Sequence, residues 1–199
     1  MRIPTISKTE NQMSDAGNWL SGRCLISMPS MTDPRFKRTV IFVCSHDEEG
    51  AMGLVINRAH NDITFQKLCA KLKIDGEDDD GIQILSGGPV EVGRGFVLHR
   101  ASTDYENTLN ITEDVGLCAT LDALQSLAVG EGPPNARVAL GYAGWGAGQL
   151  EEEILENAWL VCDADAALVL ELTPDEIYDA ALARLGVNIA ALTSASGHA

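Results

Sequence analysis

The chain has 199 residues, of which 45% are hydrophobic and 22% are charged, and its formal net charge is −15. This composition is typical of one globular domain with a core of ordinary size. Residues 101–199 contain 2 basic and 16 acidic residues, so this half carries a net charge of −14. Because nucleic-acid affinity depends mainly on basic groups that neutralise phosphates, the charge argues against direct nucleic-acid binding.

The ends of the chain differ in composition from its middle. Residues 1–17 are polar and lack the apolar segment of a signal peptide, so we expect a disordered leader there. A single domain is expected over residues 18–192 and a mobile tail over 193–199. No run approaches the roughly 18 apolar residues of a membrane span, and we expect no membrane association.

The five cysteines are odd in number and widely spaced, at positions 24, 44, 69, 118 and 162. They contain no Cys-x-x-Cys motif, which argues against a disulfide framework and a structural zinc site. The cysteine pattern therefore predicts a cytoplasmic protein.

The first half of the chain is predicted to form three strands and a helix. Apolar runs at residues 24–28, 39–44 and 54–57 predict strands, the last two forming a hairpin. Thr64 is a suitable cap for a helix whose apolar side chains, from Phe65 to Leu72, fall on one face. The acidic run at residues 75–81 fails the calcium-loop pattern, because Asp80 replaces its glycine and Ser86 its glutamate. We therefore expect a solvated acidic loop.

The second half alternates strands and helices. Strands are predicted at residues 82–85, 95–99, 108–111, 137–142 and 159–162, and a helix from about residue 119 to Gly130. A second helix is predicted over residues 149–157, with Leu150, Ile154 and Leu155 facing inward. Thr173-Pro174-Asp175-Glu176 is a capping box that begins a last helix, which ends at Gly186.

The stretch from Gly141 to Leu150 holds four glycines and two aromatic residues between a predicted strand and a predicted helix. We interpret it as a surface loop in which Tyr142 and Trp145 are available to a partner. Two roles remain open for Trp145: contact with a partner, or a core position covering the bare glycine backbone.

A second glycine-rich region includes Gly87, Gly88 and Arg94. Backbone N–H groups and a guanidinium are suitable for binding an anion, but no Walker-type or Gly-x-Gly-x-x-Gly motif is present. Turn geometry between strands explains the same glycines without a ligand, and it is the favoured interpretation.

The best catalytic candidates are Cys44, His46 and Asp47. Residues two apart on a strand leave the same face about 7 Å apart, so Cys44 and His46 would share a site and Asp47 would orient the imidazole. The alternative interpretation is that Cys44 is a buried strand residue and that His46 and Asp47 open a loop. The four histidines are not spaced as metal ligands, and we expect no metal and no cofactor.

Five separated segments, in order, resemble the AlgH/YqgE family of bacterial proteins: residues 28–36, 50–57, 87–90, 95–99 and 141–150. The resemblance covers about residues 19–192. It implies an α+β (mixed α/β) domain with a mixed sheet, partly curled into a pseudo-barrel and flanked by helices. It also implies a role in transcriptional regulation, and it implies no catalytic residues.

Two functional hypotheses follow from the sequence. The first is a cytoplasmic regulatory or binding protein that acts through another protein, using Arg35, Gly87, Gly88, Arg94, Tyr142 and Trp145 as its contact surface. The second is a small-molecule hydrolase or thiol enzyme centred on Cys44 and His46. Cys44 and Cys118 are expected to be the most reactive thiols, since one adjoins His46 and the other precedes a helix.

Overall fold

The computed structural model of this chain describes residues 19–76, 81–103, 105 and 107–186. The predicted leader at 1–17, the predicted tail at 193–199 and most of the acidic run at 75–81 lie outside the described residues. The strands are Arg23–Ser27 (β1), Val40–Asp47 (β2), Gly50–Val55 (β3), Ile84–Ser86 (β4), Val90–Arg100 (β5), Leu109–Asn110 (β6), Val115–Cys118 (β7), Arg137–Gly146 (β8) and Trp159–Asp163 (β9). The helices are Phe65–Leu72 (α1), Leu121–Ala128 (α2), Gln149–Leu155 (α3), Pro174–Arg184 (α4) and the π-helix Ala167–Glu171 (η1).

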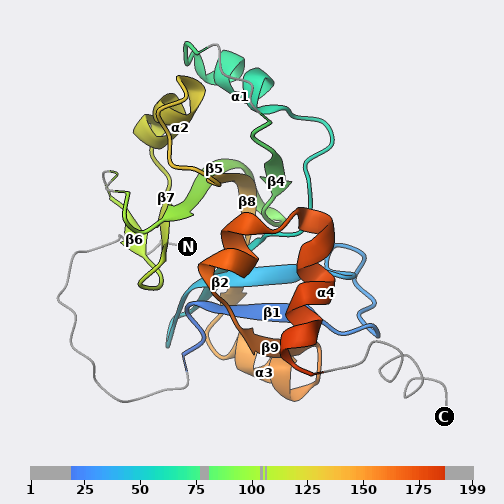
Figure 1. Cartoon of the computed structure of the whole chain (residues 1–199). Helices are drawn as coiled ribbons and strands as arrows, with labels where there is room; N and C mark the ends of the chain where they lie inside the picture. The colour runs from blue at the N-terminus through green and yellow to red at the C-terminus, as the bar shows by residue number, and fades with distance from the viewer. Residues whose placement is uncertain (1–18, 77–80, 104, 106, 187–199) are drawn as a thin grey trace.

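In the described part of the chain, the strands form one sheet in the order β6-β7-β5-β8-β3-β2-β1-β9, and β4 also pairs with β8. Neighbouring strands are antiparallel except for the parallel pair of β4 and β8. The first half of β8 pairs with β5, and its second half pairs with β3. Gly141, with φ of +72°, lies between the two halves, where the sheet curls (Figure 1).

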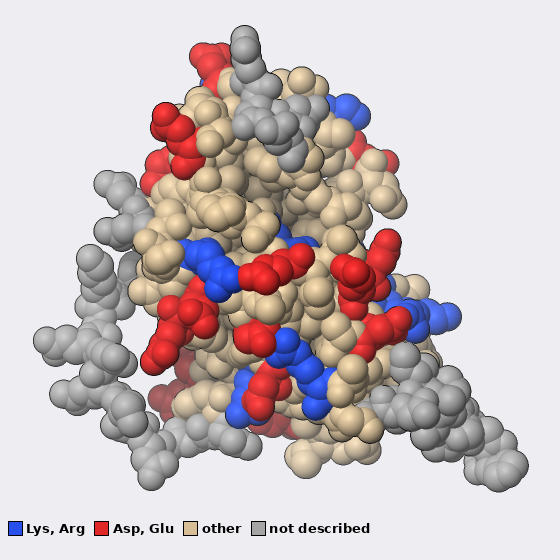
Figure 2. All heavy atoms as spheres, in the orientation of Figure 1, with Lys and Arg blue, Asp and Glu red and all other residues tan. Residues whose placement is uncertain are grey.

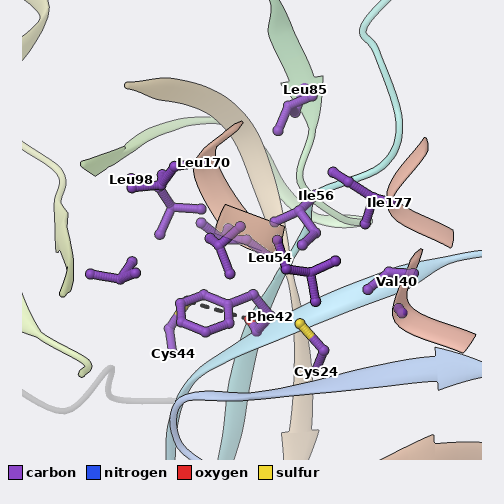
Figure 3. Packing of buried hydrophobic residues seen from close by; sticks show 14 of the residues in the cluster. Cys24, Val40, Phe42, Cys44, Leu54, Ile56, Leu85, Leu98, Leu170 and Ile177 are labelled. Atoms are coloured by element: carbon purple, nitrogen blue, oxygen red, sulfur yellow. Dashed lines mark hydrogen bonds between the residues drawn. The ribbon is translucent and has the colours of Figure 1, made fainter. Parts of the chain in front are cut away.

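Three apolar cores explain how the helices cover this curled sheet. The inner core joins one face of the sheet to η1 and α4, and Figure 3 shows part of it. The second core lies under α1 and α2, and the third lies under α3 on the outer face of β1, β2 and β3. Figure 1 shows α1 and α2 at one end and α4 across β1, β2 and β9. The expected mixed fold, a curled sheet flanked by helices, is confirmed.

The predicted helix starts are confirmed at two positions. Thr64 caps α1 by accepting a hydrogen bond from the Lys67 backbone N–H at 3.2 Å. Thr173 and Glu176 form the capping box of α4, with Pro174 in its first turn. These signals are local, and the sequence alone is sufficient to predict them.

The glycine-rich stretch was wrongly predicted to be a surface loop, because β8 continues through it to Gly146. The hairpin strand was also misplaced, since β3 spans Gly50–Val55 rather than residues 54–57. The cause is close backbone approach: a Cβ on Gly50 would lie 2.2 Å from the Trp145 carbonyl oxygen. Gly50 therefore allows β3 to pair closely with β8.

Other elements were missed or misjudged. The strand β7 and the π-helix η1 were not predicted, and β6 is shorter than the strand predicted at residues 108–111. In α3, Leu155 was predicted to face inward, yet it is 81% exposed. The helix ends at Leu155, so its apolar residues do not form one continuous buried stripe.

Candidate functional site

The structure divides the predicted contact residues between two faces of the sheet. Tyr142 packs against the inner core, where its ring meets Phe96 edge-on at 6.0 Å. Trp145 belongs to the outer core beneath α3 and is only 8% exposed. The two aromatic residues therefore do not form one surface, and Trp145 occupies the core position that the sequence left open.

Gly87 and Gly88 lie where neighbouring backbone leaves no room for a side chain. A Cβ on Gly87 would lie 2.3 Å from the Gly141 carbonyl oxygen, and one on Gly88 would lie 2.1 Å from the Tyr142 carbonyl carbon. Arg94 is engaged nearby, with its Nη1 3.2 Å from a Glu91 carboxylate oxygen and its guanidinium 5.2 Å from the Phe96 ring centre. These contacts support the turn interpretation over an anion site.

A register shift separates Cys44 from His46. Pairing of β2 with β3 moves from Val43 opposite Gly53 to Ser45 opposite Met52, so Cys44 is the extra residue of a bulge. Cys44 lies in the inner core, where its Sγ donates to the Phe42 carbonyl at 3.5 Å (Figure 3). His46 pairs with Ala51, whose side chain faces the outer core. The predicted same-face arrangement is therefore wrong.

Both nitrogens of the His46 ring have other partners. Nδ1 accepts the Leu20 backbone N–H at 3.1 Å, which places the ring hydrogen on Nε2, 3.0 Å from Glu151 Oε1. Asp47 is exposed and accepts the Glu49 backbone N–H at 2.9 Å. His46 is therefore not oriented as a base toward Cys44, and Asp47 does not orient His46.

The burial of the thiols argues against Cys44 and Cys118 as the most reactive cysteines. All five cysteines are buried and unpaired. Burial raises the pKa of Cys44 to about 12 and that of Cys118 to about 11, which opposes thiolate formation. Cys162 has a lowered pKa, because the neighbouring Cys24 thiol is hydrogen-bonded to it.

The best-organised polar cluster lies at α3. Glu153 Oε2 accepts the indole N–H of Trp145 at 2.9 Å and that of Trp159 at 2.7 Å. Glu153 Oε1 accepts from the Gln149 amide at 2.8 Å, and Gln149 in turn accepts the Gly146 backbone N–H at 3.1 Å. Two of these bonds join α3 to the end of β8, one joins it to β9, and the bond between Gln149 and Glu153 lies within the helix.

The loop before β2 adjoins this cluster. The Phe36 ring meets the Trp159 ring edge-on at 5.6 Å, which places the loop beside the start of β9. Arg35 in the same loop is exposed, and its Nη2 lies 2.7 Å from Asp33 Oδ2. That contact holds the pKa of Asp33 below its usual range. Arg35 thus lies on the surface of this loop.

The outer face of α3 combines acidic side chains with one apolar side chain. Leu155 is 81% exposed, and Glu151 and Glu152 precede it by four and three residues, so they are its neighbours on the helix. Glu152 and Glu156 are exposed and form no ion pair within the described residues. We define the α3 surface as Leu155 with Glu151, Glu152 and Glu156, and take it as the candidate binding site. The sequence analysis missed Leu155 because it assigned this residue to the core.

In the described ranges, no group of three or more His, Cys, Asp or Glu side chains is placed to hold a metal ion. Within those ranges, no helix has the length and apolar composition needed to cross a membrane.

The chain resembles known proteins over nearly all of its length. A family model described as AlgH-like matches residues 24–190. A UPF0301 protein of Beijerinckia indica is 48% identical over 192 residues, covering 92% of this chain and 94% of its own. The solution structure of the AlgH protein from Pseudomonas aeruginosa is 43% identical, with a TM-score of 0.76, covering 94% of this chain and all of its own. A crystal structure of protein DIP2367 from Corynebacterium diphtheriae, 20% identical with a TM-score of 0.67 over 86% of this chain and 90% of its own, shares the fold.

Proposed function

The chain belongs to the AlgH-like family, and on that premise we propose that it is a cytoplasmic regulatory protein that acts by binding a protein partner. The observation that carries the proposal is the α3 surface, where Leu155 is 81% exposed on a helix fixed by the Glu153 cluster. An exposed apolar side chain on a rigid support is available for contact at a low entropic cost.

The charge of the α3 surface indicates the kind of partner. Glu151 and Glu152 neighbour Leu155 on the helix, Glu156 follows it in the chain, and the C-terminal half of the chain carries a net charge of −14. Complementary charge favours a segment with Lys or Arg residues around an apolar side chain. The same charge disfavours direct binding to DNA, so an effect on transcription would pass through the partner.

The thiol-enzyme alternative lacks support from the site. Cys44 is 2% exposed, its pKa is raised by burial, and both ring nitrogens of His46 are occupied. A nucleophilic cysteine requires an accessible thiolate and an adjacent base.

The test is affinity capture from a native extract with the wild-type chain, Leu155→Ser and Val92→Ser as baits. Val92 is 66% exposed and lies on β5, away from α3, so its replacement is the matched control. A protein held by the wild type and by Val92→Ser, but lost from Leu155→Ser and released by higher salt, is the expected result.

Equal capture by Leu155→Ser and the wild type would contradict the proposed surface. In a mobility-shift titration near physiological salt, we expect random duplex DNA to bind no more tightly than about 10⁻⁴ M. Sub-micromolar binding with a steep salt dependence would contradict the indirect route.

A further inference from the structure

A cavity of about 400 Å³ lies away from the α3 surface, where three segments of the chain meet. Its walls come from residues 81–83 before β4, from the end of α2 and parts of the segment that leads to Arg137, and from residues 170–174, where η1 ends and α4 begins. Figure 2 shows the surface hollowed in this region, between the α1–α2 end and the η1–α4 end. The volume falls within the range of small-molecule sites, which is about 300–1,000 Å³.

Arg137, the first residue of β8, brings a positive charge into this cavity. Its Nη2 donates to the Leu172 carbonyl, which ends η1, and its Nε is buried without a hydrogen-bond partner. Within the described residues, Arg137 forms no ion pair, whereas Arg100 and Arg184 pair with Glu171 and Asp165. Burial lowers the pKa of Arg137, because the charged form loses hydration.

The rest of the lining suits a ligand with a polar head and an apolar body. Ile82, Leu127 and Leu170 supply apolar walls, while Gln83 and Asn135 bring side-chain amides that form no hydrogen bond within the described residues. Glu171 is the one carboxylate of the described lining, and Arg100 already pairs with it. An anion that approaches Arg137 therefore meets a cation that forms no ion pair among the residues that the structure describes.

We propose that this cavity binds a small molecule carrying an anionic group, a carboxylate or a phosphate, which pairs with Arg137 while an apolar body contacts Ile82, Leu127 and Leu170. Arginine binds both groups through charge-assisted hydrogen bonds. Because Nε is buried, the anion would contact the terminal part of the guanidinium, and it would supply the counter-charge that Arg137 lacks within the described residues. This site is independent of the α3 surface and of the proposed partner.

The experiment titrates the full chain with benzoate, benzamide and inorganic phosphate, following the arginine Nε–H signals by NMR. Benzamide has nearly the shape of benzoate without the charge. We expect saturable binding of benzoate, of phosphate or of both, a shift of the Arg137 Nε–H signal, and benzamide binding at least about tenfold weaker than benzoate. Benzoate alone would identify the anion as a carboxylate, and phosphate alone would identify it as a phosphate.

Three variants locate the site. Arg137→Gln removes the cation, and Gln83→Trp fills the rim of the cavity without touching the bond from Arg137 to Leu172. Arg38→Gln is the matched control, because Arg38 is an exposed arginine paired with Asp179 outside the cavity. We expect Gln83→Trp to weaken anion binding at least about tenfold and Arg38→Gln to leave it unchanged. If Arg137→Gln fails to fold, Gln83→Trp decides the question.

Several results would overturn the proposal. These are the absence of saturable binding by either anion, binding of benzamide as tight as that of benzoate, and unchanged binding in folded Gln83→Trp. Equal weakening by Arg38→Gln would show that the anions bind to general surface charge.

Discussion

Replacing Glu153 with alanine is expected to destabilise the fold by about 2–3 kcal/mol. The carboxylate accepts the indole N–H groups of Trp145 and Trp159, whose side chains are 8% and 3% exposed. A buried donor left without an acceptor costs about 1–3 kcal/mol, and two donors are affected. Glu153 is only partly buried, so water reaches the vacated space and the lower part of the range applies.

Two further variants separate the hydrogen bonds from the charge. In Glu153→Gln, the amide oxygen still accepts from the indoles, and we expect a loss of only about 1 kcal/mol, since neutral bonds are weaker than charge-assisted ones. Trp145→Phe removes one donor and keeps most of the ring. Combined with Glu153→Ala, it should cost less than the sum of the two single changes, because both remove the same bond.

Urea unfolding, followed by circular dichroism and by tryptophan fluorescence, measures these differences. The m-value should stay constant, so that a shift in midpoint reports stability alone. Glu152→Ala, on the same helix but exposed, is the control and should stay within about 0.5 kcal/mol of the wild type. If Glu153→Ala cost no more than Glu152→Ala, the argument that the two indoles depend on this carboxylate would be refuted.

Three other predictions follow from single contacts. Gly88→Ala should destabilise the fold by more than about 1 kcal/mol in thermal unfolding, because Gly88 has φ of +153° and a Cβ there would lie 2.1 Å from a backbone carbon. Gly93→Ala is the control: a Cβ at Gly93 meets nothing within 4 Å, so this change should be nearly neutral. The hydrogen bonds from Arg184 and from the Leu168 backbone N–H lower the pKa of Asp165 in the folded protein. Its ionised side chain therefore stabilises the fold at neutral pH, and this stabilisation is lost as the pH falls through the pKa of the folded state. The free energy of unfolding of Asp165→Asn should depend less on pH in the acid range than that of the wild type, and an unchanged pH dependence would contradict this. In native thiol labelling at pH 8 followed by mass spectrometry, Cys44 should react far more slowly than in the unfolded chain, because it is 2% exposed and burial raises its pKa to about 12. Equally rapid labelling of Cys44 in the folded and unfolded chain would contradict the packing.

The sequence by itself determined the elements whose signals are local. The Thr173 and Glu176 pair specified the start of α4, and the apolar spacing after Thr64 specified α1, because a cap and a helical face depend on residues three or four positions apart. The continuous apolar runs of β1, β2 and β9 likewise identified buried strands. The family resemblance added the curled sheet, which no local signal specifies.

Tertiary structure decided which glycines pair strands and which face each side chain occupies. Gly50, Gly88 and Gly141 lie where backbones approach closely, and a sequence pattern that predicts a turn also fits such contacts. One extra residue at Cys44 moved His46 to the other face of the sheet, because side chains alternate with a period of two. Within the part of the chain that the structure describes, Arg137 has no ion-pair partner for a similar reason: its surroundings come from segments more than 30 residues apart, and only their packing brings them together.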